Sequence, residues 1–122
     1  MEQIFRVEND KGEGPYRAEE DTGTGWMDSD HNEDDPRRPR PKYDGLAELW
    51  QQTEHFEGAP LFGFASMEQM HQWFSEQELQ RLYAIGFHVD KVESCRTLLG
   101  GHQLVFDGGC AKTVQMFSLA EL

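Results

Sequence analysis

The chain has 122 residues, of which 37% are hydrophobic, and this size and composition predict a single domain spanning residues 1–122. Its formal net charge of -12 argues against direct binding of nucleic acid or of an anionic membrane, since both require clustered lysine and arginine. No apolar run approaches the roughly 18 residues of a membrane-spanning helix, and residues 1–10 lack a signal-peptide pattern. We therefore expect a soluble, cytoplasmic protein.

The first predicted element is a strand over Gln3–Glu8, which alternates in character and is rich in strand-forming residues. A turn cluster at residues 9–12 ends it. The period of two along a strand places Arg6 on the same face as Ile4 and Glu8.

Residues 13–44 form a predicted long loop, because glycine, proline and charged residues dominate and no helical or strand period persists. In its centre an acidic block adjoins a basic one, which favours pairing within the loop. Both a mobile solvated loop and a partner-binding loop fit this pattern. The candidate partner-binding residues are Asp28, Asp30, Glu33, Asp34, Asp35, Arg37, Arg38 and Arg40.

The next predicted elements are helical. Asp44 is placed to cap a short helix that carries Leu46, Leu49 and Trp50 inward.

Residues 62–86 predict two short helices in tandem. Ser66 precedes Gln69 by three residues and Ser75 precedes Glu78 by three, so each pair can form a capping box. Gly86 follows the last apolar position and predicts the end of the second helix. The apolar positions recur at helical spacing and indicate a core-facing stripe, or alternatively a partner-binding face; they are Met67, Met70, Trp73, Phe74, Leu79, Leu82 and Tyr83.

The C-terminal part predicts strands at residues 87–92, 97–106 and 112–117, with glycine-containing turns or bulges at residues 100–101 and 107–109. The order of the predicted elements is one strand, a long loop, helices and then several strands. This order predicts an α+β fold with a mostly antiparallel sheet. Cys95 and Cys110 flank a predicted hairpin without C-x-x-C spacing. We expect free thiols in a reducing cytoplasm, with a disulfide as the alternative.

No metal site is predicted. Residues 28–34 begin like a calcium-binding loop, but Glu33 stands where glycine is needed and Pro39 where a bidentate glutamate is needed. The histidines lack the spacing of zinc ligands; they are His31, His55, His71, His88 and His102.

Several segments together resemble small uncharacterised proteins encoded by phages and prophages. They are FRVEND at residues 5–10, GPY at 14–16, the end of the proline-rich loop at 44–45, FGFASMEQMHQWF at 62–74 and GGHQLVF at 100–106. This resemblance implies an acidic accessory protein, without a cofactor, in the cytoplasm of a bacterial host. Its partner would be a host protein that it binds and modulates or inhibits, and defence components are one class of target.

The chain also distantly resembles ADP-ribosyltransferase-like domains of the Arg-Ser-Glu type, through Arg6, Ser66 and Gln103. In this resemblance Arg6 holds the pyrophosphate of NAD and Ser66 orders the site. Gln103 stands in place of the glutamate, and an amide provides no negative charge to a developing cation. The alternative function is therefore an NAD-dependent ADP-ribosyltransferase-like enzyme or an inactive nucleotide-binding relative.

Overall fold

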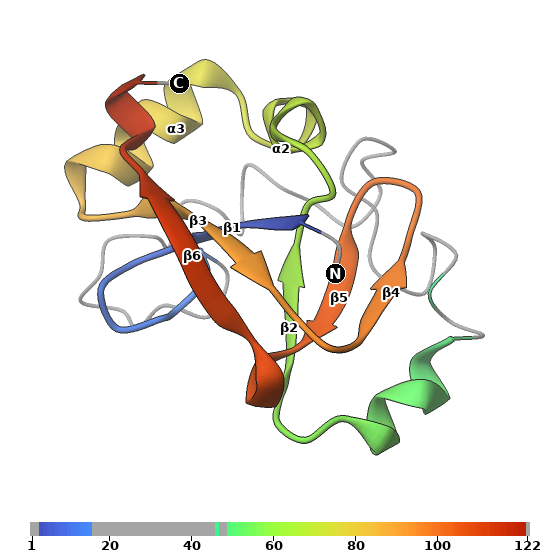
Figure 1. Cartoon of the computed structure of the whole chain (residues 1–122). Helices are drawn as coiled ribbons and strands as arrows, with labels where there is room; N and C mark the ends of the chain where they lie inside the picture. The colour runs from blue at the N-terminus through green and yellow to red at the C-terminus, as the bar shows by residue number, and fades with distance from the viewer. Residues whose placement is uncertain (1–2, 16–45, 47–48, 122) are drawn as a thin grey trace.

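The computed structural model describes residues 3–15, 46 and 49–121 (Figure 1). The elements in chain order are β1 (Gln3–Glu8), the 3-10 helix η3 (Trp50–His55), β2 (Pro60–Gly63), α2 (Met67–Trp73), α3 (Glu76–Ala84), β3 (His88–Glu93), β4 (Thr97–Leu99), β5 (Leu104–Asp107), the 3-10 helix η4 (Gly108–Cys110), β6 (Lys112–Phe117) and the 3-10 helix η5 (Leu119–Glu121). This is the predicted α+β fold. The proposed binding loop at residues 13–44 lies outside the described residues except for 13–15, so its role stays a prediction.

The strands form two antiparallel three-stranded sheets, with orders β1-β3-β6 and β2-β5-β4. Phe5 and Phe64 join the sheets, because each backbone N–H donates to the other's carbonyl at 2.8 Å. The strand predicted at residues 97–106 is divided into β4 and β5, where the Gly100 amide donates to the Gln103 carbonyl and closes a hairpin. The predicted antiparallel arrangement is thus confirmed, but the strands form two sheets and not one.

The tandem helices begin at the predicted caps. At α3 the Glu78 amide donates to the Ser75 hydroxyl at 3.2 Å, and the Ser75 amide donates to the Glu78 carboxylate at 2.8 Å. At α2 the Gln69 amide donates to the Ser66 hydroxyl, but the Gln69 side chain accepts from the amide of Ala65. The capping box is therefore complete only at α3, while both caps are confirmed.

Ser75→Ala is expected to lower the free energy of unfolding by about 1 kcal/mol, because the Glu78 amide loses its acceptor. Urea unfolding followed by circular dichroism measures this loss. Gln77→Ala, at an exposed position inside α3, is the matched control and should leave stability nearly unchanged. Equal stability of the Ser75 variant and wild type would contradict a stabilising cap.

Three apolar clusters lie between successive layers of the fold. The first joins α2 and α3 to one face of the sheet of β1, β3 and β6, and includes Met70, Trp73, Phe74, Leu79, Leu82, Val7 and Val89. The second lies between the two sheets and contains Ile4, Val92, Leu104 and Phe106. The third packs beside η3 and contains Leu46, Leu98 and Val105. The helices thus cover only one face of the first sheet.

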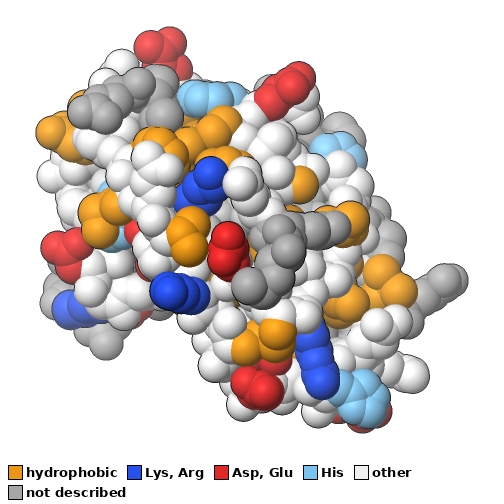
Figure 2. Space-filling view, viewed as in Figure 1, with side chains coloured by type: hydrophobic (Ala, Val, Ile, Leu, Met, Phe, Trp, Pro, Cys, Tyr) orange, Lys and Arg blue, Asp and Glu red, His pale blue; other side chains and the backbone are white. Residues whose placement is uncertain are grey.

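Two aromatic side chains predicted to face the core are exposed. Tyr83 is 51% exposed and Trp50 is 38% exposed, although the Trp50 ring stacks on Phe62. The predicted helix near Leu46 falls mostly on residues outside the described ones; Leu46 itself is buried, and η3 begins at Trp50. On the face seen in Figure 2, hydrophobic side chains form several separate groups between charged ones.

Cys95 and Cys110 form a disulfide, so the expectation of free thiols is wrong. Folding brings the end of β3 to η4 with the two Cα atoms 5.8 Å apart, which is within disulfide range. Among the described residues, no helix is both long and apolar enough to cross a membrane.

Candidate functional site

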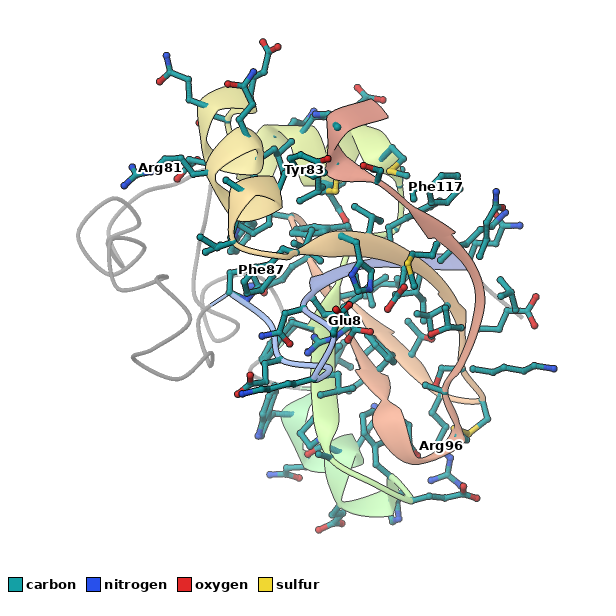
Figure 3. All side chains as sticks on the ribbon, turned by 90° about the vertical axis from the view of Figure 1, so that its left-hand side faces the viewer. Glu8, Arg81, Tyr83, Phe87, Arg96 and Phe117 are labelled. Carbon is teal, nitrogen blue, oxygen red and sulfur yellow. A yellow bond between two sulfur atoms is a disulfide. The ribbon has the colours of Figure 1, made fainter. Side chains whose placement is uncertain are left out.

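A group of polar side chains lies on the face of the β1-β3-β6 sheet that the helices do not cover. In the antiparallel register Arg6 pairs with Asp90 and Glu8 pairs with His88. Directly paired residues project to the same face, so the four side chains are neighbours. Figure 3 shows Glu8 on one side of β3 and helix α3, which carries Arg81 and Tyr83, on the other side. We call Glu8, His88 and Asp90 the acid–histidine cluster.

Arg6 is held by the protein itself. Its side chain is 9% exposed, and its Nε donates to the Glu8 carboxylate at 2.9 Å. The guanidinium also donates to the carbonyls of Phe62 at 2.9 Å and Gly12 at 3.2 Å. These bonds tie β1 to β2 and to the turn after β1. They also engage three of the five N–H donors of the guanidinium, which would be needed to hold a pyrophosphate.

Glu8 has a strongly perturbed carboxyl group. Burial disfavours its charged form and a hydrogen bond with the Asp90 side chain favours its protonated form, and these effects raise the pKa of Glu8 from 4.5 to about 7. The bond from Arg6 opposes the rise, and the negative charge of Asp90 adds to it. At neutral pH Glu8 is therefore poised between its acid and its carboxylate.

His88 lies between two carboxylates. Its Nε2 is 3.2 Å from Asp90 Oδ1, and its Nδ1 is 3.8 Å from Asp10 Oδ1. The Asp90 side chain is 4% exposed, whereas that of Asp10 is 95% exposed. Asp90 Oδ1 is fully buried and has no hydrogen-bond partner among the described residues. A carboxylate oxygen of this kind is costly, because burial removes its hydration and His88 Nε2 is the polar atom beside it.

The acid–histidine cluster can hold either a shared proton or a cation. Glu8, His88 and Asp90 each direct one possible ligand atom to a space in which these atoms lie within 4.8 Å of one another. Cys95, Asp107 and Cys110 meet the same distance condition, but the two sulfurs are bonded to each other. Asp107, in turn, accepts hydrogen bonds from backbone amides. Of these two groups, the acid–histidine cluster has the ligand atoms that are less engaged by other bonds within the protein.

The residues of the ADP-ribosyltransferase resemblance have internal roles. Ser66 is exposed and caps α2. Gln103 is 6% exposed and accepts from Gly100 in the β4–β5 turn. With the Arg6 donors also engaged, these contacts provide no support for a nucleotide site. The binding of NAD stays a prediction.

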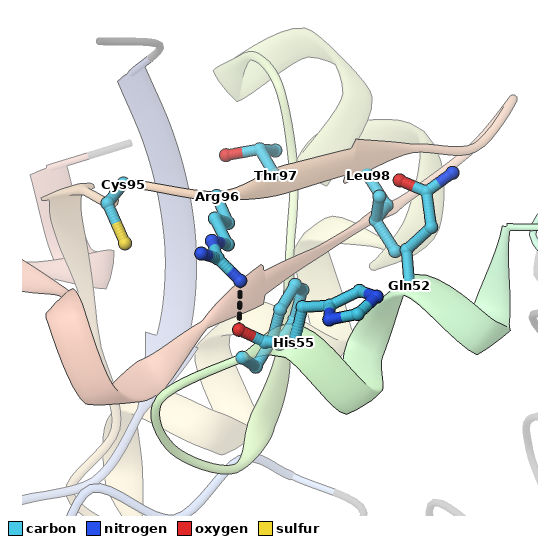
Figure 4. Close-up of a pocket in the computed structure, with 7 residues that line it drawn as sticks. Gln52, His55, Cys95, Arg96, Thr97 and Leu98 are labelled. Carbon is cyan, nitrogen blue, oxygen red and sulfur yellow. Dashed lines mark hydrogen bonds between the residues drawn. The ribbon is translucent and has the colours of Figure 1, made fainter.

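An open depression of about 640 Å³ lies between η3 and the chain around β4. Gln52, His55 and Leu98 are among its lining residues, and the Arg96 guanidinium donates to the His55 carbonyl across it (Figure 4). None of the residues predicted for a catalytic site lines this depression.

The spacing of the histidines along the chain does not connect His88 with Glu8 or Asp90. One signal was available: His88 and Asp90 are two residues apart on a predicted strand, as Arg6 and Glu8 are. Their meeting depends on the register between β1 and β3, which no local pattern specifies.

Comparison with known proteins gives one match. Neither the curated proteins nor the solved structures include a significant relative. The model of the family described as bacteriophage T4 Y00F protein matches residues 1–120. This agrees with the phage resemblance of the sequence, and the match covers both the strands of the acid–histidine cluster and the tandem helices. The chain therefore belongs to the bacteriophage T4 Y00F protein family.

Proposed function

We propose that this phage-encoded accessory protein binds a host protein and modulates or inhibits it, and that strand β6 is the principal contact. The observation that carries the proposal is the exposure of β6. Every residue of this strand from Lys112 to Met116 is exposed, although the strand belongs to a sheet whose other strands are largely buried.

The outer edge of β6 is open among the described strands, because β3 pairs with its inner edge only. Its pairing is also irregular: Thr113 and Gln115 pair with the consecutive residues Val92 and Lys91, which leaves Val114 as the extra residue of a bulge. A free edge offers unpaired backbone groups to a partner strand. The bulge limits regular pairing with further copies of the same strand.

Two large apolar side chains lie on this open strand. Val114 is 44% exposed and Met116 is 63% exposed, the latter the highest value among the large hydrophobic residues described. Apolar side chains of this size at a strand edge favour a partner that buries them, and methionine adapts well to a partner's shape. The net charge of -12 favours a partner that is neutral or basic. The charged loop at residues 28–40 is a second proposed contact.

The double variant Val114→Asp/Met116→Asp is expected to lose capture of the host protein, because it places two charges where the partner buries apolar side chains. The measurement is affinity capture from host lysate with the tagged full chain, followed by mass spectrometry. A binding assay with the purified target then follows, in which we expect at least a tenfold weaker affinity for the double variant.

The matched control is Tyr83→Asp/Leu99→Asp, which adds the same charge at apolar side chains that are 51% and 52% exposed elsewhere. This control should bind as wild type does. Equal binding by the β6 variant and wild type would exclude β6 as the contact. Failure of wild type to retain any host protein above background, at low and at physiological salt, would contradict the proposed function.

A further inference from the structure

We infer that the acid–histidine cluster of Glu8, His88 and Asp90 is a binding site for a divalent transition-metal cation of the Zn²⁺ class. Its ligands belong to β1 and β3, whereas the proposed contact with a host protein lies on β6, whose Met116 pairs with Asp90. An orphaned oxygen, the spacing of the donor atoms and the groups around them support the site.

The orphaned oxygen is the first observation. Asp90 is 3% exposed, and its Oδ1 has no hydrogen-bond partner among the described residues although it lies 3.2 Å from His88 Nε2. When the imidazole is neutral and carries its proton on Nδ1, two lone pairs face each other at this distance. Buried lone pairs that face each other at this distance repel. A cation between them would turn the repulsion into two bonds.

The spacing of the donor atoms fits such a cation. Two ligands of a tetrahedral zinc ion, each about 2.0–2.1 Å from the metal, lie roughly 3.3 Å apart. The separation of 3.2 Å between Asp90 Oδ1 and His88 Nε2 has this value. Glu8 supplies a third donor, and all three atoms lie within 4.8 Å of one another. A modest movement of the Glu8 side chain, which is 17% exposed, would complete a three-ligand site.

The surrounding groups support the same assignment. Asp10 lies on the Nδ1 side of His88, where a carboxylate commonly orients a metal-binding imidazole so that Nε2 faces the metal. Arg6 donates to Oε2 of Glu8, which holds the carboxylate in place. A bound metal would replace the hydrogen bond between the side chains of Glu8 and Asp90. One imidazole with two carboxylates favours Zn²⁺ or Mn²⁺-like ions over Ca²⁺ and Mg²⁺, which prefer all-oxygen sites.

The test is titration of the metal-free full chain with Zn²⁺ by calorimetry, and with Co²⁺ by visible absorption. We expect one ion per chain, micromolar or tighter binding, and d–d bands of Co²⁺ typical of four or five ligands. We expect Asp90→Asn and His88→Gln to weaken binding by at least 100-fold, and Asp10→Asn by up to tenfold.

His71→Gln is the matched control, because it removes an exposed histidine on α2 that lies outside the cluster. It should bind Zn²⁺ as wild type does, and circular dichroism verifies that each variant is folded. The Co²⁺ spectrum of wild type needs no variant, so the test stands even if Asp90→Asn fails to fold. Millimolar, non-stoichiometric binding, or binding unchanged in folded His88→Gln, would overturn the inference.

Discussion

Gly58→Ala is expected to lower the free energy of unfolding by about 3 kcal/mol. A Cβ atom at residue 58 would lie 2.6 Å from the backbone nitrogen of Gly109 and 2.7 Å from its Cα. Both contacts are with backbone, so no side chain can rotate to make room. The segment before β2 and the 3-10 helix η4 would have to separate.

That separation would break a buried hydrogen-bond centre at Asp107. Its carboxylate is fully buried and accepts from the amides of Glu57 at 2.6 Å, Gly58 at 3.0 Å and Gly109 at 2.8 Å. Burial by itself raises the pKa of Asp107, but these backbone donors and the positive charge of Arg96 outweigh it and hold the pKa below its ordinary value of 3.8. The ionised carboxylate thus joins three amides that have no other acceptor in the described contacts.

Urea unfolding of Gly58→Ala measures the effect. The matched control is Gly14→Ala, because a Cβ there meets only the Arg6 side chain at ordinary contact distances of 3.4 Å and more. We expect the control to stay within about 0.5 kcal/mol of wild type. If both variants had wild-type stability, the close approach of residues 58 and 109 would not be a property of the folded protein.

Glu8→Gln is expected to stabilise the metal-free protein above pH 7 and to have little effect near pH 5. The pKa of Glu8 is raised from 4.5 to about 7 in the folded state, chiefly because burial disfavours its charge. The folded state therefore binds more protons than the unfolded state between these two pH values. It follows that stability falls as the pH rises through this window.

The size of this effect has an upper bound of roughly 3.5 kcal/mol, because the pKa rises from 4.5 to about 7 and one pKa unit corresponds to about 1.4 kcal/mol. Glutamine cannot ionise, so the variant avoids the cost of a buried charge while keeping a hydrogen-bond acceptor for Arg6. The difference in stability between variant and wild type should therefore grow in favour of the variant from pH 5 to pH 8.

Urea unfolding at several pH values in the presence of a chelator measures this difference. Glu54→Gln removes an exposed carboxylate on η3 and controls for the change in net charge. The free energy of unfolding of this control should differ from that of wild type by a small amount that stays constant from pH 5 to pH 8. A Glu8→Gln variant whose stability runs parallel to wild type across this pH range would contradict the raised pKa of Glu8.

The local elements of this protein follow from short-range patterns. The caps at Ser66 and Ser75 and the end of α3 at Gly86, where φ is +96°, depend on residues within a few positions of one another. The alternation in β1 likewise predicts that Ile4, Arg6 and Glu8 share a face, and the register of β1 with β3 agrees with it. The phage family could also be recognised from the sequence, because its motifs extend over most of the chain.

Local patterns did not predict the exposure of Trp50 and Tyr83, because a helical stripe indicates an apolar face but not how far the core extends over it. Likewise, spacing along the chain left the state of Cys95 and Cys110 open, since it does not tell how close the two Cα atoms come in the fold.

The sequence by itself determined β1, the two capped helices and the segments that form the C-terminal strands, because capping, periodicity and turn formation act between neighbours in the chain; strand β2 was not predicted. The tertiary structure alone decided that Glu8 meets His88 and Asp90, and that β6 has an open outer edge among the described strands. The physical reason is that these features depend on strand order and register. Both are set by the packing of the whole core, to which every element contributes.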